Sequence, residues 1–124
     1  MKKKTGSVIT VKAQFIGYHK WDGAPAEVSF LQNYHRHIFY VTLCLAVGHD
    51  DREKEFFMVQ RQLKDVMVEE GYDDEAVLGS ESCEMIATNI GNRFYDMDVE
   101  WVKVSEDNEN SAVVFFKEAE DEVI

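Results

Sequence analysis

Apolar and polar residues alternate along two stretches in the first part of the chain. From Ser7 to His19 the apolar side chains occupy every second position, which is typical of a half-buried β-strand. The stretch Tyr34–Val47 is rich in β-branched and aromatic residues and lacks glycine and proline, so it predicts a second long strand. The loop between them, Lys20 to about Gln32, is expected to contain a short turn of helix at Glu27–Leu31.

The middle of the chain changes to a helical period. Apolar residues recur there at the spacing of an amphipathic helix: Phe56, Val59, Leu63 and Val66 or Met67. This predicts a helix over Arg52–Glu70, with Asp51 as N-cap and Gly71 as its end. After the acidic connector Tyr72–Glu75, a second helix is predicted to start at the N-cap Ser82, and its apolar stripe is Cys83, Ile86, Ile90 and Phe94.

Two shorter strands are predicted to close the fold. Val99–Ser105 and Ser111–Lys117 flank the polar turn Glu106–Asn110, which is typical of a hairpin. The order β-β-α-α-β-β predicts an α+β fold, an antiparallel four-stranded sheet with two helices on one face. Residues 1–124 are expected to form a single domain, with a core at about 7–117 and a frayed acidic tail at 118–124.

Charge and composition narrow the function classes. The chain has 13 basic and 24 acidic residues, a formal charge of -11, which disfavours general nucleic-acid binding. No apolar run approaches the ~20 residues of a membrane span, and none follows Lys2–Lys4 as in a signal peptide. The only cysteines, Cys44 and Cys83, form no C-x-x-C pair, so a reducing, cytoplasmic location is expected.

Three histidines are candidate metal ligands. His35 and His37 are two residues apart on a predicted strand, so both rings leave the same face, and His19 ends the first strand at the apolar parity. If these strands pair, the three imidazoles can converge at one end of the sheet. Three neutral imidazoles with an open fourth position suit zinc. The alternative is two surface histidines at a strand end plus an unrelated third.

Other residues offer weaker patterns. The Glu106 carboxylate can accept paired N–H donors from a purine- or pterin-like edge, or it is an ordinary turn residue. Ser82 and Cys83 lie at a helix N-terminus, where free N–H groups can hold a ligand, or they are a plain cap and a buried structural thiol. Cys44 has the opposite parity from the histidines, and the acids at Glu69–Glu75 are interpreted as a solvated connector rather than a cation site.

Four short segments, in the same order, resemble motifs of the 6-pyruvoyl tetrahydropterin synthase and 6-carboxy-tetrahydropterin synthase family. Phe15–His19 resembles its F-x-A-A-H element, and His35–His37 resembles its H-G-H element. Ser82–Ala87 resembles its P-T-x-E-N-x-A helix start. Val104–Glu106, followed by Asn110–Phe115, resembles its V-x-E-T hairpin.

The resemblance implies a T-fold (tunnelling fold) with a specific set of site residues. By that resemblance the metal ligands are His19, His35 and His37, and the metal is zinc. Glu106 would anchor a pterin or purine ring, to which Ser82 and Cys83 would offer backbone groups. T-fold proteins close their sheets into barrels with sites between subunits, so a homo-oligomer, trimer or hexamer, is implied.

The chain also departs from the family pattern. Leu31 stands where the family has a cysteine four residues before its H-G-H element. The segment Tyr72–Ser80 contains no histidine, whereas the family has an Asp-His pair between the helices. Arg36 replaces the glycine of H-G-H and is expected to crowd a tight site. These departures remove the expected proton-transfer groups.

The sequence therefore supports one main hypothesis and several alternatives. The main hypothesis is a zinc-binding T-fold oligomer that binds a purine- or pterin-like ligand and lacks the family's catalytic set. A divergent synthase-like lyase would instead use zinc-bound water, with Asp73, Asp74 or His49 as base. A viral protein that sequesters a host nucleotide, and a structural oligomer with inert histidines, are the remaining alternatives.

Overall fold

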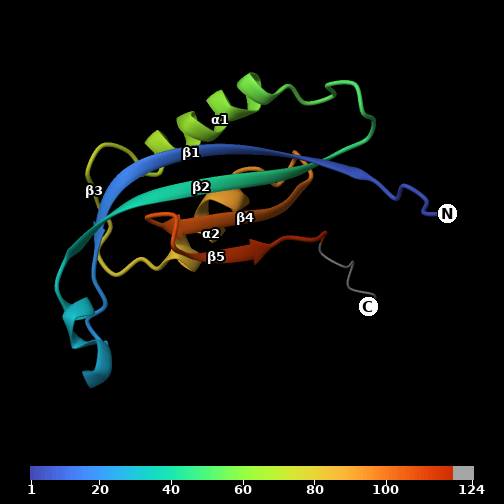
Figure 1. The fold of residues 1–124 in the computed structure, drawn as a ribbon. Coiled ribbons are helices and arrows are strands. Elements are labelled where there is room, and N and C mark those ends of the chain that lie inside the picture. Colours follow the sequence, from blue (N-terminus) through green and yellow to red (C-terminus); the bar gives the residue numbers. More distant parts are fainter. Residues whose placement is uncertain (119–124) are drawn as a thin grey trace, which may run out of the picture.

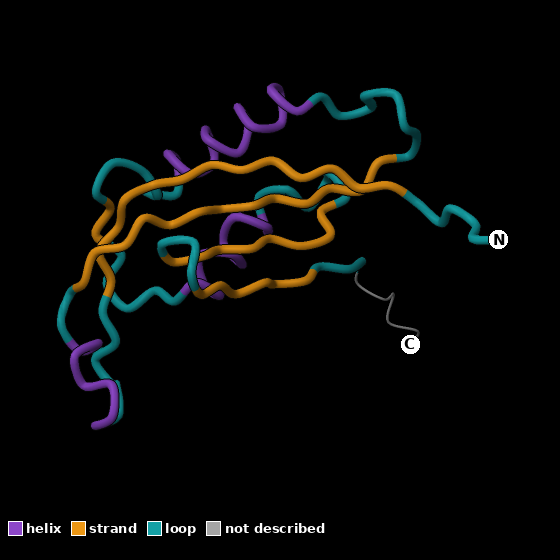
Figure 2. The backbone as a smooth tube through the Cα atoms, in the orientation of Figure 1, coloured by secondary structure: helices purple, strands orange, loops and turns teal. Residues whose placement is uncertain are grey.

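The computed structural model describes residues 1–118, which form a single five-stranded sheet and its covering helices (Figures 1 and 2). Along the chain the elements are β1 (Ser7–His19), the 3-10 helix η1 (Ala26–Gln32), β2 (His35–Val47), α1 (Phe56–Glu69), β3 (Ala76–Val77), α2 (Cys83–Asn92), β4 (Val99–Glu106) and β5 (Asn110–Phe115). The strand order is β3-β1-β2-β4-β5, antiparallel except for the parallel pair β1 and β3. This confirms the predicted α+β class.

The strands β1 and β2 form a long curved ribbon that extends past the rest of the sheet towards η1 (Figure 1). They pair in unbroken register from Ser7 opposite Val47 to His19 opposite His35. On the other side of β2, β4 pairs so that Phe39 lies opposite Glu106. Three strands therefore bring their polar ends to the same end of the sheet.

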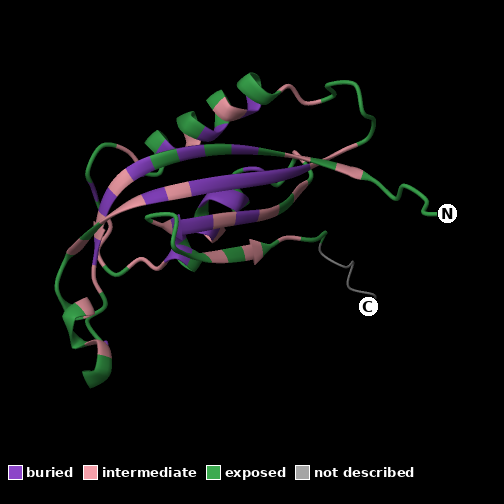
Figure 3. Cartoon of the chain, viewed as in Figure 1, coloured by how far each residue is buried: buried purple, intermediate pink, exposed green. Residues whose placement is uncertain are grey.

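One face of the sheet carries the hydrophobic core, and the burial alternates along β1 (Figure 3). Side chains of one parity from three strands are buried: Val11, Ala13, Phe15, Phe39, Val41, Leu43, Leu45, Val102 and Val104. Both helices pack on this face through Val59, Leu63, Met67, Ile86, Ala87 and Ile90. Burying each large apolar side chain contributes roughly 1.5–3 kcal/mol, so the alternation fixes which residues face the helices.

The sheet has five strands rather than the predicted four, because β3 joins it. Ala76 and Val77 lie beside Gly17 and Tyr18 at the outer edge of β1. Just beyond them, the Leu78 amide donates to the Tyr18 carbonyl at 2.9 Å, and the Lys20 amide donates to the Gly79 carbonyl at 2.9 Å. A two-residue strand carries no alternation, so the sequence pattern could not reveal it.

The prediction that α1 starts at Arg52 with Asp51 as N-cap was wrong. Arg52 has a φ of 55°, a left-handed conformation that turns the chain, and the helix begins at Phe56. The N-cap is Glu55, whose carboxylate accepts from the amides of Phe57 and Met58. The predicted end at Gly71 is confirmed by its φ of 84°.

The remaining boundaries differ only slightly from the predicted ones. Ser82 caps α2 as predicted, with its hydroxyl accepting from the Met85 amide, but the helix ends before Phe94. The hairpin turn is Asp107–Glu109, because Glu106 and Asn110 still pair. The predicted acidic tail lies, apart from Glu118, outside the described residues. Within residues 1–118, no helix is long and apolar enough to cross a membrane.

Candidate metal centre

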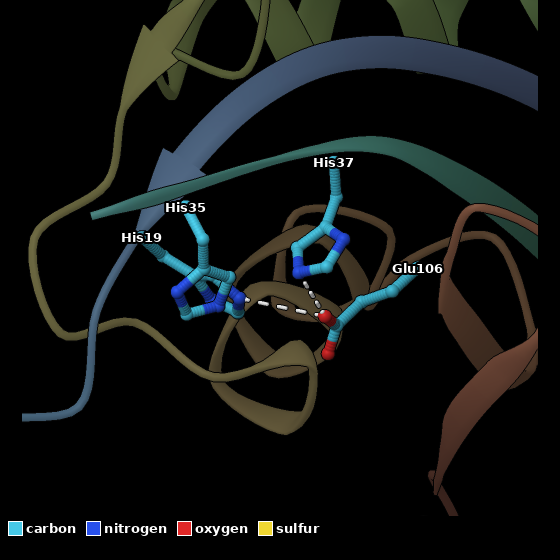
Figure 4. A group of neighbouring side chains, drawn as sticks. All are labelled: His19, His35, His37 and Glu106. Atoms are coloured by element: carbon cyan, nitrogen blue, oxygen red, sulfur yellow. Dashed lines mark ion pairs between the residues drawn. The ribbon is translucent and has the colours of Figure 1, made fainter. Parts of the chain in front are cut away.

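Strand alternation places four polar side chains at one end of the core-facing side of the sheet. His19 continues the buried row of β1, His35 and His37 continue that of β2, and Glu106 continues that of β4. One ligand atom from each residue can be chosen so that all four lie within 4.8 Å of one another. Figure 4 shows the three rings and the carboxylate pointing towards a common centre. Within residues 1–118 this is the one group able to hold a metal ion.

Each imidazole is oriented through its Nδ1 atom. The Nδ1 of His19 lies 2.8 Å from the Glu81 carbonyl oxygen, and the Nδ1 of His35 lies 3.0 Å from the Asn33 carbonyl oxygen. The Nδ1 of His37 lies 2.6 Å from Oδ2 of Asp107. These oxygens only accept hydrogen bonds, so each Nδ1 carries the proton. In the neutral ring each Nε2 then carries the free lone pair, the arrangement that orients histidines as metal ligands.

Within residues 1–118, the Nε2 atom of His37 has no satisfactory hydrogen-bond partner. Nε2 of His37 is buried and makes no hydrogen bond of acceptable geometry, although Oε2 of Glu106 lies only 2.5 Å away. The same Oε2 lies 3.6 Å from Nε2 of His19. Lone pairs that face a carboxylate oxygen at such distances repel unless a proton or a cation lies between them. Three imidazole nitrogens and one carboxylate oxygen form a donor set that suits four-coordinate zinc.

The pKa shifts in the cluster agree with its preference for positive charge. Burial alone lowers the pKa of His19, but the contact with Glu106 and the Glu81 carbonyl raise it, and the net shift is upwards. The pKa of Glu106 is lowered, chiefly by His19 and also by His37, against the opposing effect of burial. The carboxylate therefore stays ionised, and the site provides negative charge for a bound cation.

A cavity of about 350 Å³ opens beside the cluster. His19, His35 and Glu106 line one part of it, and the start of α2, with Ser82 and Cys83, lines another. Two of the three predicted metal ligands, His19 and His35, thus line the same cavity as the predicted ring-binding residues, and His37 does not line it. The rest of its lining includes Trp21, Leu31, Glu81 and Met85.

Cys83 is a protonated thiol rather than a nucleophile. Its Sγ lies 3.7 Å from Oε1 of Glu106, and only 6% of the residue is exposed. Burial and the nearby Glu106 charge raise the pKa of Cys83 to about 12, so the thiolate needed for nucleophilic attack is absent at neutral pH. Cys44 is fully buried at mid-strand, and both cysteines are free.

Several residues considered from the sequence lie away from the cluster. Arg36 is exposed and alternates with the two histidines, so the expected crowding of the site was wrong. His49 lies two residues beyond Val47, at the opposite end of β2 from His35. Asp73 and Asp74 do not line the cavity. Leu31, at the family's cysteine position, does line it and offers no proton-transfer group.

Two contributors were missed by the sequence patterns. Asp107 holds His37 through Oδ2 and accepts from the Ile38 amide through Oδ1 at 2.8 Å. The sequence could have suggested Asp107, because it directly follows the candidate residue Glu106 in the predicted turn. Glu81 acts through its backbone carbonyl, while its side chain accepts from the Tyr72 hydroxyl at 2.6 Å. Every residue has a backbone carbonyl, so the residue type at position 81 could not indicate this contact.

Comparison with known proteins gives matches at the level of structure. No protein-family description and no curated protein matches the sequence. The 6-pyruvoyl tetrahydropterin synthase of Caenorhabditis elegans aligns with a TM-score of 0.64 and 14% identity over 94% of this chain and 100% of that one. An uncharacterized protein of Wolinella succinogenes aligns with a TM-score of 0.62 and 12% identity over 92% of this chain and 100% of that one. The chain therefore has the T-fold that 6-pyruvoyl tetrahydropterin synthase has, as its short motifs predicted.

Proposed function

We propose that this protein is a zinc-binding T-fold oligomer that holds a purine- or pterin-like ring beside its metal and does not carry out the usual synthase or lyase reaction. The observation that carries the proposal is the orientation of three Nε2 atoms towards one point, with every Nδ1 bonded to an acceptor. Inert surface histidines have no need of such fixed tautomers. Zinc bound there would supply a Lewis-acid centre at the cavity wall.

Ring binding is supported by the position of Glu106. Its carboxylate faces both the histidine cluster and the cavity that the start of α2 lines. A carboxylate can accept two parallel N–H bonds from a guanidine-like ring edge, and Ser82 and Cys83 line the same cavity beside it. Leu31 and the histidine-free segment Tyr72–Ser80 support binding without turnover, because Leu31 cannot transfer a proton and neither Asp73 nor Asp74 lines the cavity.

A second candidate, a closed structural zinc site, is favoured by the 2.5 Å approach of Glu106 to His37. In that case the carboxylate would be the fourth ligand and no position would remain for a ring. The two candidates differ in what Glu106→Ala does. If Glu106 is a ring anchor, the variant keeps its zinc and loses ring affinity. If Glu106 is a ligand, the variant loses zinc affinity.

The deciding experiment combines elemental analysis with calorimetry on wild type, Glu106→Ala and Glu109→Ala. Glu109 is an exposed carboxylate of the same hairpin and serves as the control. The ligands are a panel of pterins and guanine nucleotides. Loss of a charge-assisted pair costs about 1.5–3 kcal/mol, so Glu106→Ala is expected to bind the ring about tenfold to a hundredfold more weakly. Equal ring affinity in all three proteins would reject the anchor, and rapid turnover of dihydroneopterin triphosphate would reject the claim of lost catalysis.

Oligomer formation is supported by the open edges of the sheet. β5 is an edge strand on which Phe115 is 76% exposed, and β3 covers only the last part of the outer edge of β1. Exposed strand edges are usually paired or covered. Closure through these edges would give the trimer or hexamer, which solution scattering at micromolar concentration would detect. The buried free thiols support a reducing compartment such as the cytoplasm.

A further inference from the structure

A second cavity, of about 520 Å³, lies at the β1 edge of the sheet, where α1 meets the face opposite the histidine cluster. It lies over two adjacent rows of the sheet. In one row, Lys12, Thr42 and Lys103 are neighbours across three strands, and in the next row Gln14, Tyr40 and Ser105 are neighbours. All of these alternate with core residues, so they lie on the side away from α2 and the metal centre.

The charge of this cavity is opposite to that of the protein. Three lysines line it, Lys12 and Lys103 from the sheet and Lys64 from α1. Among the described residues no aspartate or glutamate lines it, although the chain has 24 acids and a formal charge of -11. None of the three ammonium groups forms an ion pair within residues 1–118, whereas Lys4, Lys20 and Lys54 each do. Three ammonium groups without ion-pair partners give this cavity a local positive charge that can attract an anion.

A buried hydroxyl in the same lining also lacks a partner. Ser105 is 4% exposed, and its Oγ makes no hydrogen bond to any of residues 1–118. A buried polar atom without a partner costs about 1–3 kcal/mol, so native structures rarely leave one unsatisfied without a reason. Ser105 lies on the same face as Lys103, two residues away, so its O–H comes within reach of an oxyanion held by the lysines once the side chains that cover it move aside. The other polar lining groups, on Gln14, Tyr40, Thr42 and Asn108, can also donate hydrogen bonds.

We propose that this cavity is a binding site for a multiply charged phosphate anion, separate from the metal centre, in which Lys12, Lys64 and Lys103 supply the charge and Ser105 donates a hydrogen bond. Three point charges suit a chain of two or three phosphate groups better than a single carboxylate. The anion can be free, as inorganic triphosphate, or carried by a nucleotide. The site does not depend on the proposed function, because it shares no residue with the histidine cluster or its cavity.

The test is calorimetry of the full chain at about 150 mM salt with inorganic triphosphate, a nucleoside triphosphate and orthophosphate as probes. Triphosphate is expected to bind more tightly than orthophosphate. Equal affinity for the free and the nucleoside-bound triphosphate means that the phosphate chain alone is recognised. Tighter binding of the nucleotide means that the cavity also accepts the nucleoside. Failure of all three probes to bind would overturn the proposal.

Matched variants locate the site. Lys12→Gln and Lys103→Gln are each expected to weaken triphosphate binding about tenfold, because a hydrogen bond to a charged group is lost. Lys4→Gln, which removes the same charge from the other end of β1, should change the affinity less than about twofold. Ser105→Ala should weaken binding about threefold and raise the melting temperature of the free protein, because it removes a buried hydroxyl that has no partner within residues 1–118. An equal effect of Lys4→Gln and Lys103→Gln would overturn the site, since net charge alone would then explain binding.

Chemical modification gives a readout that does not depend on variant folding. Lysine acetylation of the wild-type protein, followed by mass spectrometry, reports each ammonium group separately. With triphosphate present, Lys12 and Lys103 are expected to be protected several-fold, while Lys4 keeps its rate. Uniform protection of all lysines, or none, would contradict a site in this cavity.

Discussion

The two ends of the β1–β2 ribbon contain similar residue types but differ in how those residues are held. At one end, His19, His35 and His37 project from strands and meet Glu106. At the other end, beyond Val47, a histidine and several acids line a cavity of about 450 Å³. Only the first end gathers ligand atoms within reach of one metal ion among the described residues.

The difference lies in which hydrogen bonds are already satisfied. At the far end, the Asp50 carboxylate accepts from Lys4 and from the Ser7 hydroxyl, and Glu53 accepts from the Gly48 amide. His49 is exposed, and its Nδ1 accepts from the Asp51 amide at 3.2 Å. At the histidine cluster, by contrast, the outer Nδ1 atoms are satisfied, whereas the buried inner Nε2 of His37 has no hydrogen-bond partner among residues 1–118. Residue types alone do not make a site; fixed, inward-facing lone pairs do.

The strongest test of this contrast is to remove one histidine from each end. Wild type purified without chelator is expected to carry about one zinc per chain. His35→Ala should lose it and His49→Ala should keep it, because only His35 belongs to the cluster. At zinc concentrations about a hundredfold above Kd, the bound metal adds about 2.7 kcal/mol to the unfolding free energy, so EDTA should lower the melting temperature of wild type and His49→Ala only. Equal zinc contents in all three proteins would show that the two ends of the ribbon do not differ in metal binding.

A smaller effect is expected from the carboxylates that support each end. Asp107→Asn keeps a side-chain oxygen for the Ile38 amide but removes the negative charge that orients His37. Loss of such a supporting carboxylate typically weakens metal binding about tenfold to a hundredfold. Asp50→Asn, the matched change at the far end, should leave zinc affinity unchanged. Competition with a chromophoric chelator measures both variants, and equal affinities for Asp107→Asn and wild type would show that His37 needs no orientation.

The parts of the site that the sequence predicted are those fixed by strand periodicity. Alternation every two residues placed His19, His35 and His37 on the core face before their neighbours were known. It could not show that Asp107, one residue beyond Glu106, curls back to His37, because turn geometry breaks the alternation.

Other features depend on contacts between distant segments. The two-residue strand β3 exists only because it meets β1, and the Glu81 carbonyl is identified only by its distance to His19. The cavity lined by Lys12, Lys64 and Lys103 depends on a strand register that brings Lys12 next to Thr42 and Thr42 next to Lys103. Local patterns specify faces, whereas pairing between strands specifies neighbours.

The smallest expected effect is the pH dependence at the far end. The contact with Lys4, followed by that with Ser7, holds the pKa of Asp50 below its ordinary value of 3.8. A carboxyl whose pKa is lowered on folding stabilises the protein above the unfolded pKa, and this contribution is lost as the pH falls through the folded value. The melting temperatures of metal-free wild type and Asp50→Asn should therefore differ near neutral pH and converge in acid. Added salt should shrink the difference, because Lys4 and Asp50 are both exposed to solvent. A difference that persists unchanged in acid would show that Asp50 acts by packing rather than by charge.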